Sequence, residues 1–294
     1  MPIFRKALLA HLALLTVAII YGLNYVWAKD VMPKYIQPSG FILARVGGAG
    51  LLFVVFHWLT GWHWPRKEDW PRFVACGFMG VAGNQLLFFH GLSLTSPTNS
   101  AIIMTLSPLM VLLLAAQFGN ERFGLNRWLG LTIAGSGAIW LVWNSQQGGN
   151  RSANALGDLF ILLNGSMYAG YLVSVKPLME RYPPIAVIQW VFLIGLILVI
   201  PFGLNQFLMV NWLSLPTEAI GKIGFVVLFT TFVAYLFNIF AIKVVGSSIT
   251  GLYIYLQPVL AAFFVFLGGG GHPNLIQIIS GLVVMLGVFM GSRK

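Results

Sequence analysis

Acidic side chains are scarce in this chain of 294 residues, which holds seven Asp and Glu against 17 Lys and Arg. Charged residues of both signs make up only 8% of the chain, whereas a soluble domain carries roughly 25%. A chain so poor in charge cannot cover a folded surface with groups that water solvates. The composition therefore excludes a soluble domain and indicates that lipid is the solvent of this protein.

Cysteine is nearly absent too, and so are the motifs of catalysis. Cys76 stands alone, which excludes an internal disulfide framework and a cysteine metal cluster. There is no phosphate-binding loop, no nucleophile elbow, no acidic motif for a magnesium diphosphate and no paired carboxylate inside an apolar run. We therefore expect no enzyme, no cofactor, no metal site and no ATP-driven pump in this chain.

Long apolar runs are what the sequence does contain. Hydrophobic residues make up 58% of the chain, and the mean hydropathy is +0.85. A spanning helix needs about 20 mostly apolar residues. Ten stretches qualify, and we number them helices 1 to 10 in this order: near 8–28, 38–58, 73–94, 97–117, 126–144, 156–178, 184–203, 220–242, 247–267 and 273–291. The runs do not alternate as barrel strands do, so we predict an all-α membrane protein with ten transmembrane helices.

The two halves of the sequence repeat each other. Four residues recur at an offset of 147, namely Tyr21, Lys29, Met32 and Tyr35, which match Tyr168, Lys176, Met179 and Tyr182. Farther along, Leu106-Ser107-Pro108 matches Leu256-Gln257-Pro258 at an offset of 150, and Gly130 matches Gly281 at 151. We predict a five-helix repeat over 1–145, a linker over 146–155 and a second five-helix repeat over 156–294. Such repeats are typical of transporters with a site at the repeat interface.

The basic residues indicate the orientation. The net charge of +10 would suggest a nucleic-acid partner for a soluble protein, but here the basic residues flank the apolar runs, so we expect no nucleic acid. With the N-terminus inside, twelve Lys and Arg fall on the inner side and four on the outer side, with Arg45 inside a helix. We expect a bacterial inner (plasma) membrane protein with both termini cytoplasmic. Because each half holds an odd number of helices, the repeats should be inverted.

Five short motifs fall in the predicted helices, namely Ile20-Tyr21-Gly22-Leu23-Asn24-Tyr25-Val26, Leu43-Ala44-Arg45, Leu106-Ser107-Pro108-Leu109, Gly157-Asp158-Leu159 and Leu256-Gln257-Pro258-Val259. Together they resemble the EamA family of the drug/metabolite transporter superfamily. The resemblance covers nearly the whole chain. It implies ten helices in two inverted halves and the export of amino acids, other metabolites or drugs. The family commonly has a Glu after helix 4 and another after helix 9. Glu121 fills the first position, and a run of glycines ending at His272 fills the second.

Polar side chains recur at equivalent places inside the predicted helices and suggest a substrate site. Residues spaced by three, four or seven share one helical face. The candidate substrate-binding residues are Asn24, Arg45, Gln85, His90, Ser107, Tyr168, Tyr235, Asn238, Tyr253 and Gln257. Two interpretations stay open. These groups either line a common cavity, with Tyr253 and Gln257 facing Ser107, Gln85 and Tyr235, or bond helix to helix at about 0.6 kcal/mol per bond.

Two ionisable residues stand out within the apolar runs. Arg45 lies roughly 10 Å into its helix at 1.5 Å per residue, where it either contacts a substrate anion or bonds backbone carbonyls. His90 is either a proton relay, since its unperturbed pKa lies near 6.5, or a packing residue. Pro108 and Pro258 should bend helices 4 and 9, as hinges or as inherited kinks.

The function that these features favour is secondary transport of small metabolites such as amino acids, in the direction of export. Its partners would be a small-molecule substrate, the lipid bilayer and protons as a coupling ion. A membrane enzyme acting on a lipid-linked substrate and a facilitated channel are the alternatives. The sequence carries no signal of oligomeric state.

Overall fold

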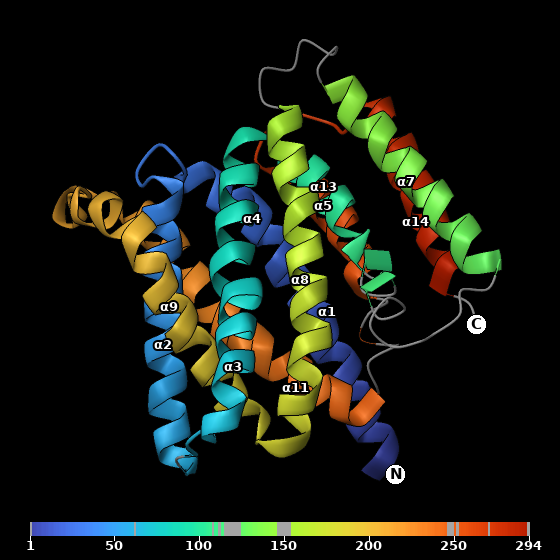
Figure 1. Ribbon diagram of the computed structural model, residues 1–294. Helices are drawn as coiled ribbons and strands as arrows, with labels where there is room; N and C mark the ends of the chain where they lie inside the picture. Colours follow the sequence, from blue (N-terminus) through green and yellow to red (C-terminus); the bar gives the residue numbers. More distant parts are fainter. Residues whose placement is uncertain are drawn as a thin grey trace.

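The computed structural model describes residues 2–61, 63–107, 109–110, 113–114, 125–145, 154–245, 250, 253–269 and 271–292. Throughout these residues the regular elements are helices, packed side by side into a bundle (Figure 1). The prediction of an all-α membrane protein is therefore confirmed, and each of the ten predicted stretches contains helix.

The first half of the chain runs through helices that follow the predicted order. They are α1 (Pro2–Val31), α2 (Pro38–Thr60), the short turn η1 (Lys67–Asp69), the continuous run α3 (Trp70–Gly77), η2 (Phe78–Ala82) and α4 (Gly83–Leu94), then α5 (Pro97–Met104) and α7 (Leu125–Ser145). Four of these helices, α1, α2, α3 and α5, have a proline in their first turn, where its missing N–H leaves no bond unmade.

The second half repeats this order. It contains α8 (Ala155–Arg181), α9 (Pro184–Leu208), the turn η3 (Trp212–Ser214), the continuous run α10 (Thr217–Phe225), η4 (Val226–Val233) and α11 (Ala234–Val245), then η5 (Tyr253–Tyr255), α13 (Leu256–Leu267) and α14 (Leu275–Ser292). Over the described residues, six helices are long and apolar enough to cross a membrane, and Leu256–Leu267 and Leu275–Gly287 are shorter apolar helices.

Helices 4 and 9 both depart from the α-helical pattern within their described residues. In the first half, α5 ends at Met104 and a tight turn follows, in which Leu106 N–H donates to the carbonyl of Ile103 at 3.0 Å. In the second half the 3₁₀ turn η5 runs directly into α13, so that Pro258 lies in the first turn of α13 instead of in mid-helix. Proline is tolerated there, because the first N–H groups of a helix have no partner anyway. Pro108 lies outside the described residues.

Helices 3 and 8 each contain a π-helical segment at corresponding positions. Shifting the range 78–82 of η2 by the repeat offset of 150 gives 228–232, which lies inside η4 (Val226–Val233). A π-helix holds more residues per turn than an α-helix and is found frequently at functional sites. Both segments lie in the core, since Gly80, Val81, Thr230 and Thr231 are buried.

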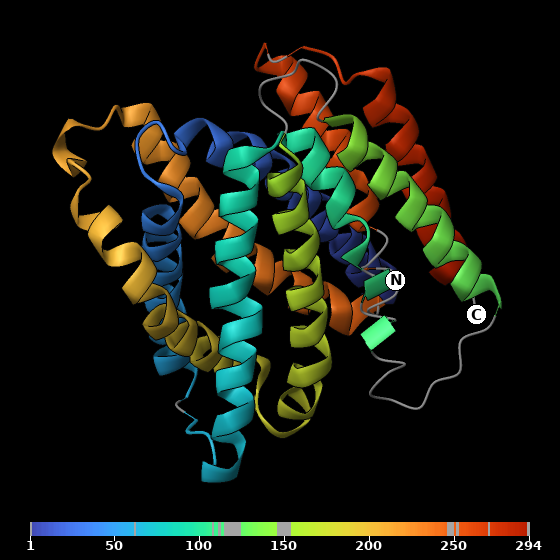
Figure 2. The ribbon, with the colours of Figure 1, turned by 45° about the horizontal axis from the view of Figure 1, so that its top comes forward.

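The equivalent helices α1 and α8 run in opposite directions. In Figure 1, α1 rises from the N-terminus at the bottom to the top of the view, whereas α8 descends from the top to the bottom. The pair α7 and α14 lies at one edge of the bundle, and the two helices remain side by side when the view is turned (Figure 2). The bundle that is left, built around α1, α2, α4, α8 and α9, encloses the buried core.

Candidate functional site

The centre of the bundle holds a buried arginine that is bonded to both repeats. Arg45 of α2 is 6% exposed. Its Nη1 donates to Oε1 of Gln85 in α4 at 2.8 Å, and its Nε donates to Oγ1 of Thr231 in η4 at 2.8 Å. The ring of Phe89 covers one face of the guanidinium, 5.1 Å from its carbon. Arg45 therefore ties helices 2, 3 and 8 together.

The π segment η4 prepares Thr231 for this contact. The hydroxyl of Thr231 donates to the carbonyl of Val226, five residues earlier, at 3.2 Å. With its proton used in this way, the oxygen turns a lone pair to Arg45 Nε. A charged side chain at this depth costs about 2.5–3.5 kcal/mol on insertion scales, so its hydrogen bonds have a strong effect on where it lies.

Tyrosines from both repeats surround this arginine. Tyr21 of α1 and Tyr235 of α11 both lie within electrostatic range of Arg45, and Tyr168 of α8 lies within range of Tyr21 and Tyr235. The hydroxyls of these three tyrosines have no hydrogen-bond partner among the described residues. We call Arg45, Gln85, Thr231 and these three tyrosines the central polar cluster.

Close packing of glycine positions the helix that carries Tyr168. A Cβ atom added to Gly80 would lie 2.5 Å from the ring of Tyr171, one turn after Tyr168. Farther along the same contact, a Cβ on Gly91 would lie 2.8 Å from the carbonyl of Gly157. The absence of side chains at these glycines thus lets helix 3 and α8 approach closely.

The predicted site residues outside the central polar cluster differ in their contacts. Buried Gln257 accepts a hydrogen bond from the hydroxyl of Tyr25 at 3.3 Å. Asn24 is buried with no partner for Oδ1, and Ser107 donates to the carbonyl of Met104 and lies against Gly165 of α8. His90 lies toward the end of α4, where Nε2 is 2.8 Å from Oγ of Ser39.

Tyr253 lies apart from the central polar cluster, whereas Asn238 lies three residues after Tyr235 in α11. Tyr253 contacts His11, with its hydroxyl 2.8 Å from Nδ1, and the two side chains line an open pocket of about 460 Å³ with Leu12, Leu15 and Leu256. His11 is ten residues before Tyr21, about 15 Å along α1, so this pocket is separate from the cluster. Asn238 is partly buried in α11 and has no hydrogen bond within the described part of the chain.

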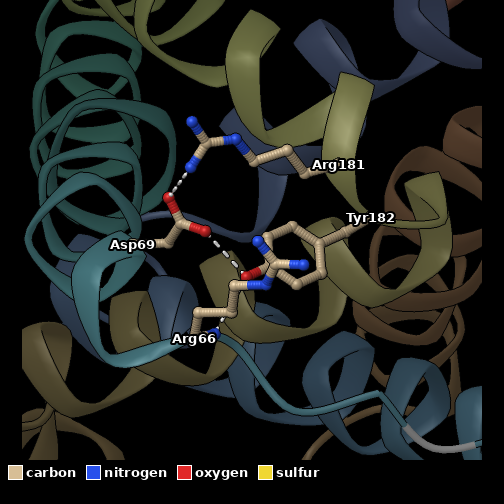
Figure 3. A network of polar contacts seen from close by, with 4 residues as sticks. All are labelled: Arg66, Asp69, Arg181 and Tyr182. Atoms are coloured by element: carbon tan, nitrogen blue, oxygen red, sulfur yellow. Dashed lines mark hydrogen bonds and ion pairs between the residues drawn. The ribbon is translucent and has the colours of Figure 1, made fainter.

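At one end of the bundle, a carboxylate joins the two repeats. Asp69 of η1 is 3% exposed, and Arg181 at the end of α8 donates to it at 2.7 Å (Figure 3). The hydroxyl of Tyr182 donates to the other carboxylate oxygen at 2.7 Å and accepts a bond from the backbone N–H of Arg66 at 2.8 Å. Burial raises the pKa of Tyr182, which keeps this hydroxyl protonated and donating. We call these four residues the Asp69 network.

The opposite end carries a second ion-pair group built from the corresponding helices. Lys222 of α10 contacts Asp30 at the end of α1 at 2.8 Å and Glu218 at 2.7 Å. The Asp69 network links the start of helix 3 to the end of helix 6, and the Lys222 pairs link the start of helix 8 to the end of helix 1. The repeat relates helix 3 to helix 8 and helix 1 to helix 6, so the two groups lie at equivalent helix ends, although they are built from different residues.

Sequence reasoning did not identify three of these features. Thr231 and Asp69 were not among the residues that the sequence singled out, and Asp158 stood out only within a motif. Asp158 is fully buried in the first turn of α8, where Thr95 donates to it at 2.5 Å. The match of Tyr35 with Tyr182 was the one signal that marked these turns.

Comparison with known proteins gives the same class throughout. The chain is 28% identical to an uncharacterized transporter, YyaM of Bacillus subtilis, over 98% of this chain and 94% of the relative. It is 23% identical to a probable terminal-alkyne amino-acid exporter of Streptantibioticus cattleyicolor, over 87% of this chain and 84% of that protein. A solved crystal structure shares the fold, with a TM-score of 0.64 at 17% identity and coverage of 96% of both chains.

The family profile matches the chain twice, once in each half. The profile of the EamA-like transporter family aligns with residues 8–143 and again with residues 155–293. These two matches account for nearly every helix described above, including those that carry the central polar cluster. The chain is a multi-pass membrane protein, and it belongs to the EamA-like transporter family.

Proposed function

We propose that this protein is a secondary transporter that exports small metabolites such as amino acids through a central site between its two repeats. The observation that carries the proposal is the central polar cluster, in which α1, α2 and α4 of the first half meet α8, η4 and α11 of the second. Polar groups at membrane depth must face protein or water rather than lipid. The name of the S. cattleyicolor relative, an amino-acid exporter, supports the choice of substrate class.

Alternating access is the mechanism that we propose for this site. The Asp69 network and the Lys222 pairs fasten opposite ends of the bundle, and they join repeat-equivalent helices. If one set opens while the other stays closed, the centre faces each side of the membrane in turn. The opposite directions of α1 and α8 support an inverted repeat, with a first repeat over 1–145 and a second over 156–294. The breaks before Pro258 and after α5 are the proposed hinges.

Protons are the coupling ion in this proposal, since the sequence has no nucleotide site. His90 is the candidate carrier, because its ring is bonded to Ser39 between α2 and α4 and imidazole is the side chain most often used as a proton shuttle. The orientation belongs to the same proposal, with both termini cytoplasmic in the inner membrane. The proposed function also includes transport of the substrate without a catalytic step.

The test is transport in proteoliposomes against a panel of amino acids and related metabolites, with and without a pH gradient. We expect saturable exchange that is lost in Gln257→Ala while the variant still elutes as a single species. Gln37→Ala, the same change at an exposed position before α2 whose side chain makes no capping bond, is the matched control. Full transport by Gln257→Ala would mean that this residue only packs helices. Unsaturable flux would favour a channel, and a pH response intact in His90→Gln would remove His90 as the proton carrier.

A further inference from the structure

The charge of Arg45 has no counter-ion in the described structure. The ion pairs involve Arg181 and Lys222 at the two ends, and none involves Arg45. The sequence holds seven acids, and the six described ones lie in or near the ends of helices. Asp158, the most deeply buried, is ten residues before Tyr168, about 15 Å along α8. Glu121 lies outside the described residues.

One nitrogen of the guanidinium is also without a partner. Nε is bonded to Thr231 and Nη1 to Gln85, while among the described residues Nη2 makes no hydrogen bond. The ring of Phe89 lies over a face of the group, 5.1 Å from its carbon. The N–H groups of Nη2 therefore remain to donate charge-assisted hydrogen bonds to an oxyanion.

The hydrogen-bonding groups of the central polar cluster that have no partner in the described structure can act as donors. Gln85 Oε1 and Thr231 Oγ1 already accept from Arg45. The hydroxyls of Tyr21, Tyr168 and Tyr235 each retain a proton to donate. An incoming oxyanion would therefore find donors from both repeats, whereas an incoming ammonium group would find a positive charge and no carboxylate.

The buried positive charge of Arg45 has no counterpart at the equivalent position of the second repeat. Adding the offset of 147 to Arg45 gives Phe192 in α9, a helix without a single Lys or Arg. Phe192 packs against Phe53 and Tyr235 with ring centroids 5.0 and 5.6 Å apart. A ligand at the centre would therefore have its anionic group toward α2 and an apolar, aromatic wall on the α9 side.

We propose that the transported molecule carries a carboxylate that binds Nη2 of Arg45 and the hydroxyls of Tyr21 and Tyr235, so that the substrate supplies the missing counter-ion. Arg45 is then the residue that selects organic acids and amino acids over organic amines. An amino acid would direct its ammonium group to tyrosine ring faces, which attract cations. This inference rests on the proposed transport function and specifies the chemistry of its site.

The experiment compares matched compounds that differ in one ionic group. The purified full-length protein is titrated with phenylalanine, 2-phenylethylamine and 3-phenylpropanoate, and with the leucine and alanine analogues of this trio. Binding is measured by thermal shift and by tryptophan fluorescence. We expect the carboxylate-bearing members of at least one trio to bind at least tenfold more tightly than the amine. One or two charge-assisted bonds account for about ten- to hundredfold in Kd.

Substitution of the arginine gives the second readout. Arg45→Gln should weaken binding of the carboxylates at least tenfold and leave the weak binding of the amine unchanged. Arg72→Gln, which removes the same charge from an exposed position at the start of α3, should bind as the wild type does. If Arg45→Gln does not fold, the wild-type comparison within the trios decides alone.

Three results would overturn the proposal: an amine that binds as tightly as its acid, carboxylates that bind Arg45→Gln with unchanged Kd, or no carboxylate in the panel that shifts Tm. The proposed function fails separately, because carboxylate binding without any flux in proteoliposomes contradicts transport and leaves the role of Arg45 intact.

Discussion

Gly80 lies at the closest approach between helix 3 and α8, directly beneath the ring of Tyr171. A Cβ there would come within 2.5 Å of the ring, so any side chain must push α8 away. We expect Gly80→Val to destabilise the protein by about 1–3 kcal/mol, the usual range for overpacking. The measurement is the Tm of the detergent-purified protein.

The control for this substitution is Gly224→Ala in helix 8, where an added Cβ meets no atom within 4 Å. This variant should melt with the wild type or slightly above it, because alanine stabilises helices relative to glycine. Equal Tm values for Gly80→Val and the wild type would show that α8 is not held by this contact.

At the scale of single residues, the sequence indicated which polar groups lie inside the bundle, but it did not indicate which residues they contact. Arg45, Gln85 and Tyr235 could be picked out because polar groups are conspicuous in apolar helices. Thr231 and Phe89 could not, because their role depends on the rotation of helix 8 and on which ring covers the guanidinium. Tyr253 shares a helical face with Gln257 in an ideal α-helix. The 3₁₀ turn η5 breaks that face and leaves Tyr253 beside His11.

At the scale of elements, one turn between helices is held by a buried ion pair. In the Asp69 network a buried carboxylate is paired with a half-exposed arginine. We expect Arg181→Gln to destabilise the protein by about 1–2 kcal/mol, because Asp69 would keep a buried charge with Tyr182 as a single donor. Adding Asp69→Asn should recover much of the loss, since no unpaired charge then remains. Urea or thermal unfolding of the two variants and of Asp69→Asn alone completes the double-mutant cycle.

Glu218→Gln at the other end is the comparison for that cycle. Glu218 is 77% exposed, and exposed ion pairs contribute about 0–1 kcal/mol. Its removal should barely change stability. A double variant less stable than Arg181→Gln would mean that Asp69 acts through bonds other than its ion pair.

Considered as elements, the helices were predicted closely where their apolar runs are long, as in α2 and α9, whose first residues were placed within one residue. Helices 4 and 9 were expected as spans bent at their prolines, and the described residues show a turn just before Ser107 and a 3₁₀ segment just before Gln257. The residue before a proline avoids the α region, and that restraint was interpreted only as a kink. The π segments left no trace in hydropathy, since Phe78–Ala82 and Val226–Val233 are as apolar as their neighbours.

The whole molecule has two faces toward water, and the proposed orientation assigns one to the cytoplasm. We expect cysteines placed at Lys67 and at Leu213 to be labelled from opposite sides of the membrane. Leu213 is fully exposed in η3, and Lys67 lies in η1 at the other end of α9 and α2. The background is Cys76→Ala, which removes the one native thiol, itself buried.

The measurement uses an impermeant maleimide on intact cells and then on inverted vesicles. Lys67→Cys should react only in inverted vesicles, and Leu213→Cys only in cells. Reaction of both from one side would contradict a bundle that spans the membrane. The reverse pattern would keep the fold and invert the orientation that the basic residues predict.

Because helices 3 and 8 contain π segments, the orientation of the site residues depends on how many residues each of these helices holds. Each holds a residue more than an α-helix would need between the same two ends. Because the wide turn absorbs that residue, the side chains on its two sides keep the phase they would have on a regular helix one residue shorter. Winding the same residues as α would turn Gln85 and Phe89 by about 100° relative to the start of helix 3, and Arg45 would lose its partners although every one of them was still encoded. For relatives of this protein, we therefore expect a single-residue gap at the π segment of helix 3 or helix 8 to keep the site in phase, and a single-residue gap elsewhere in these helices to disrupt it.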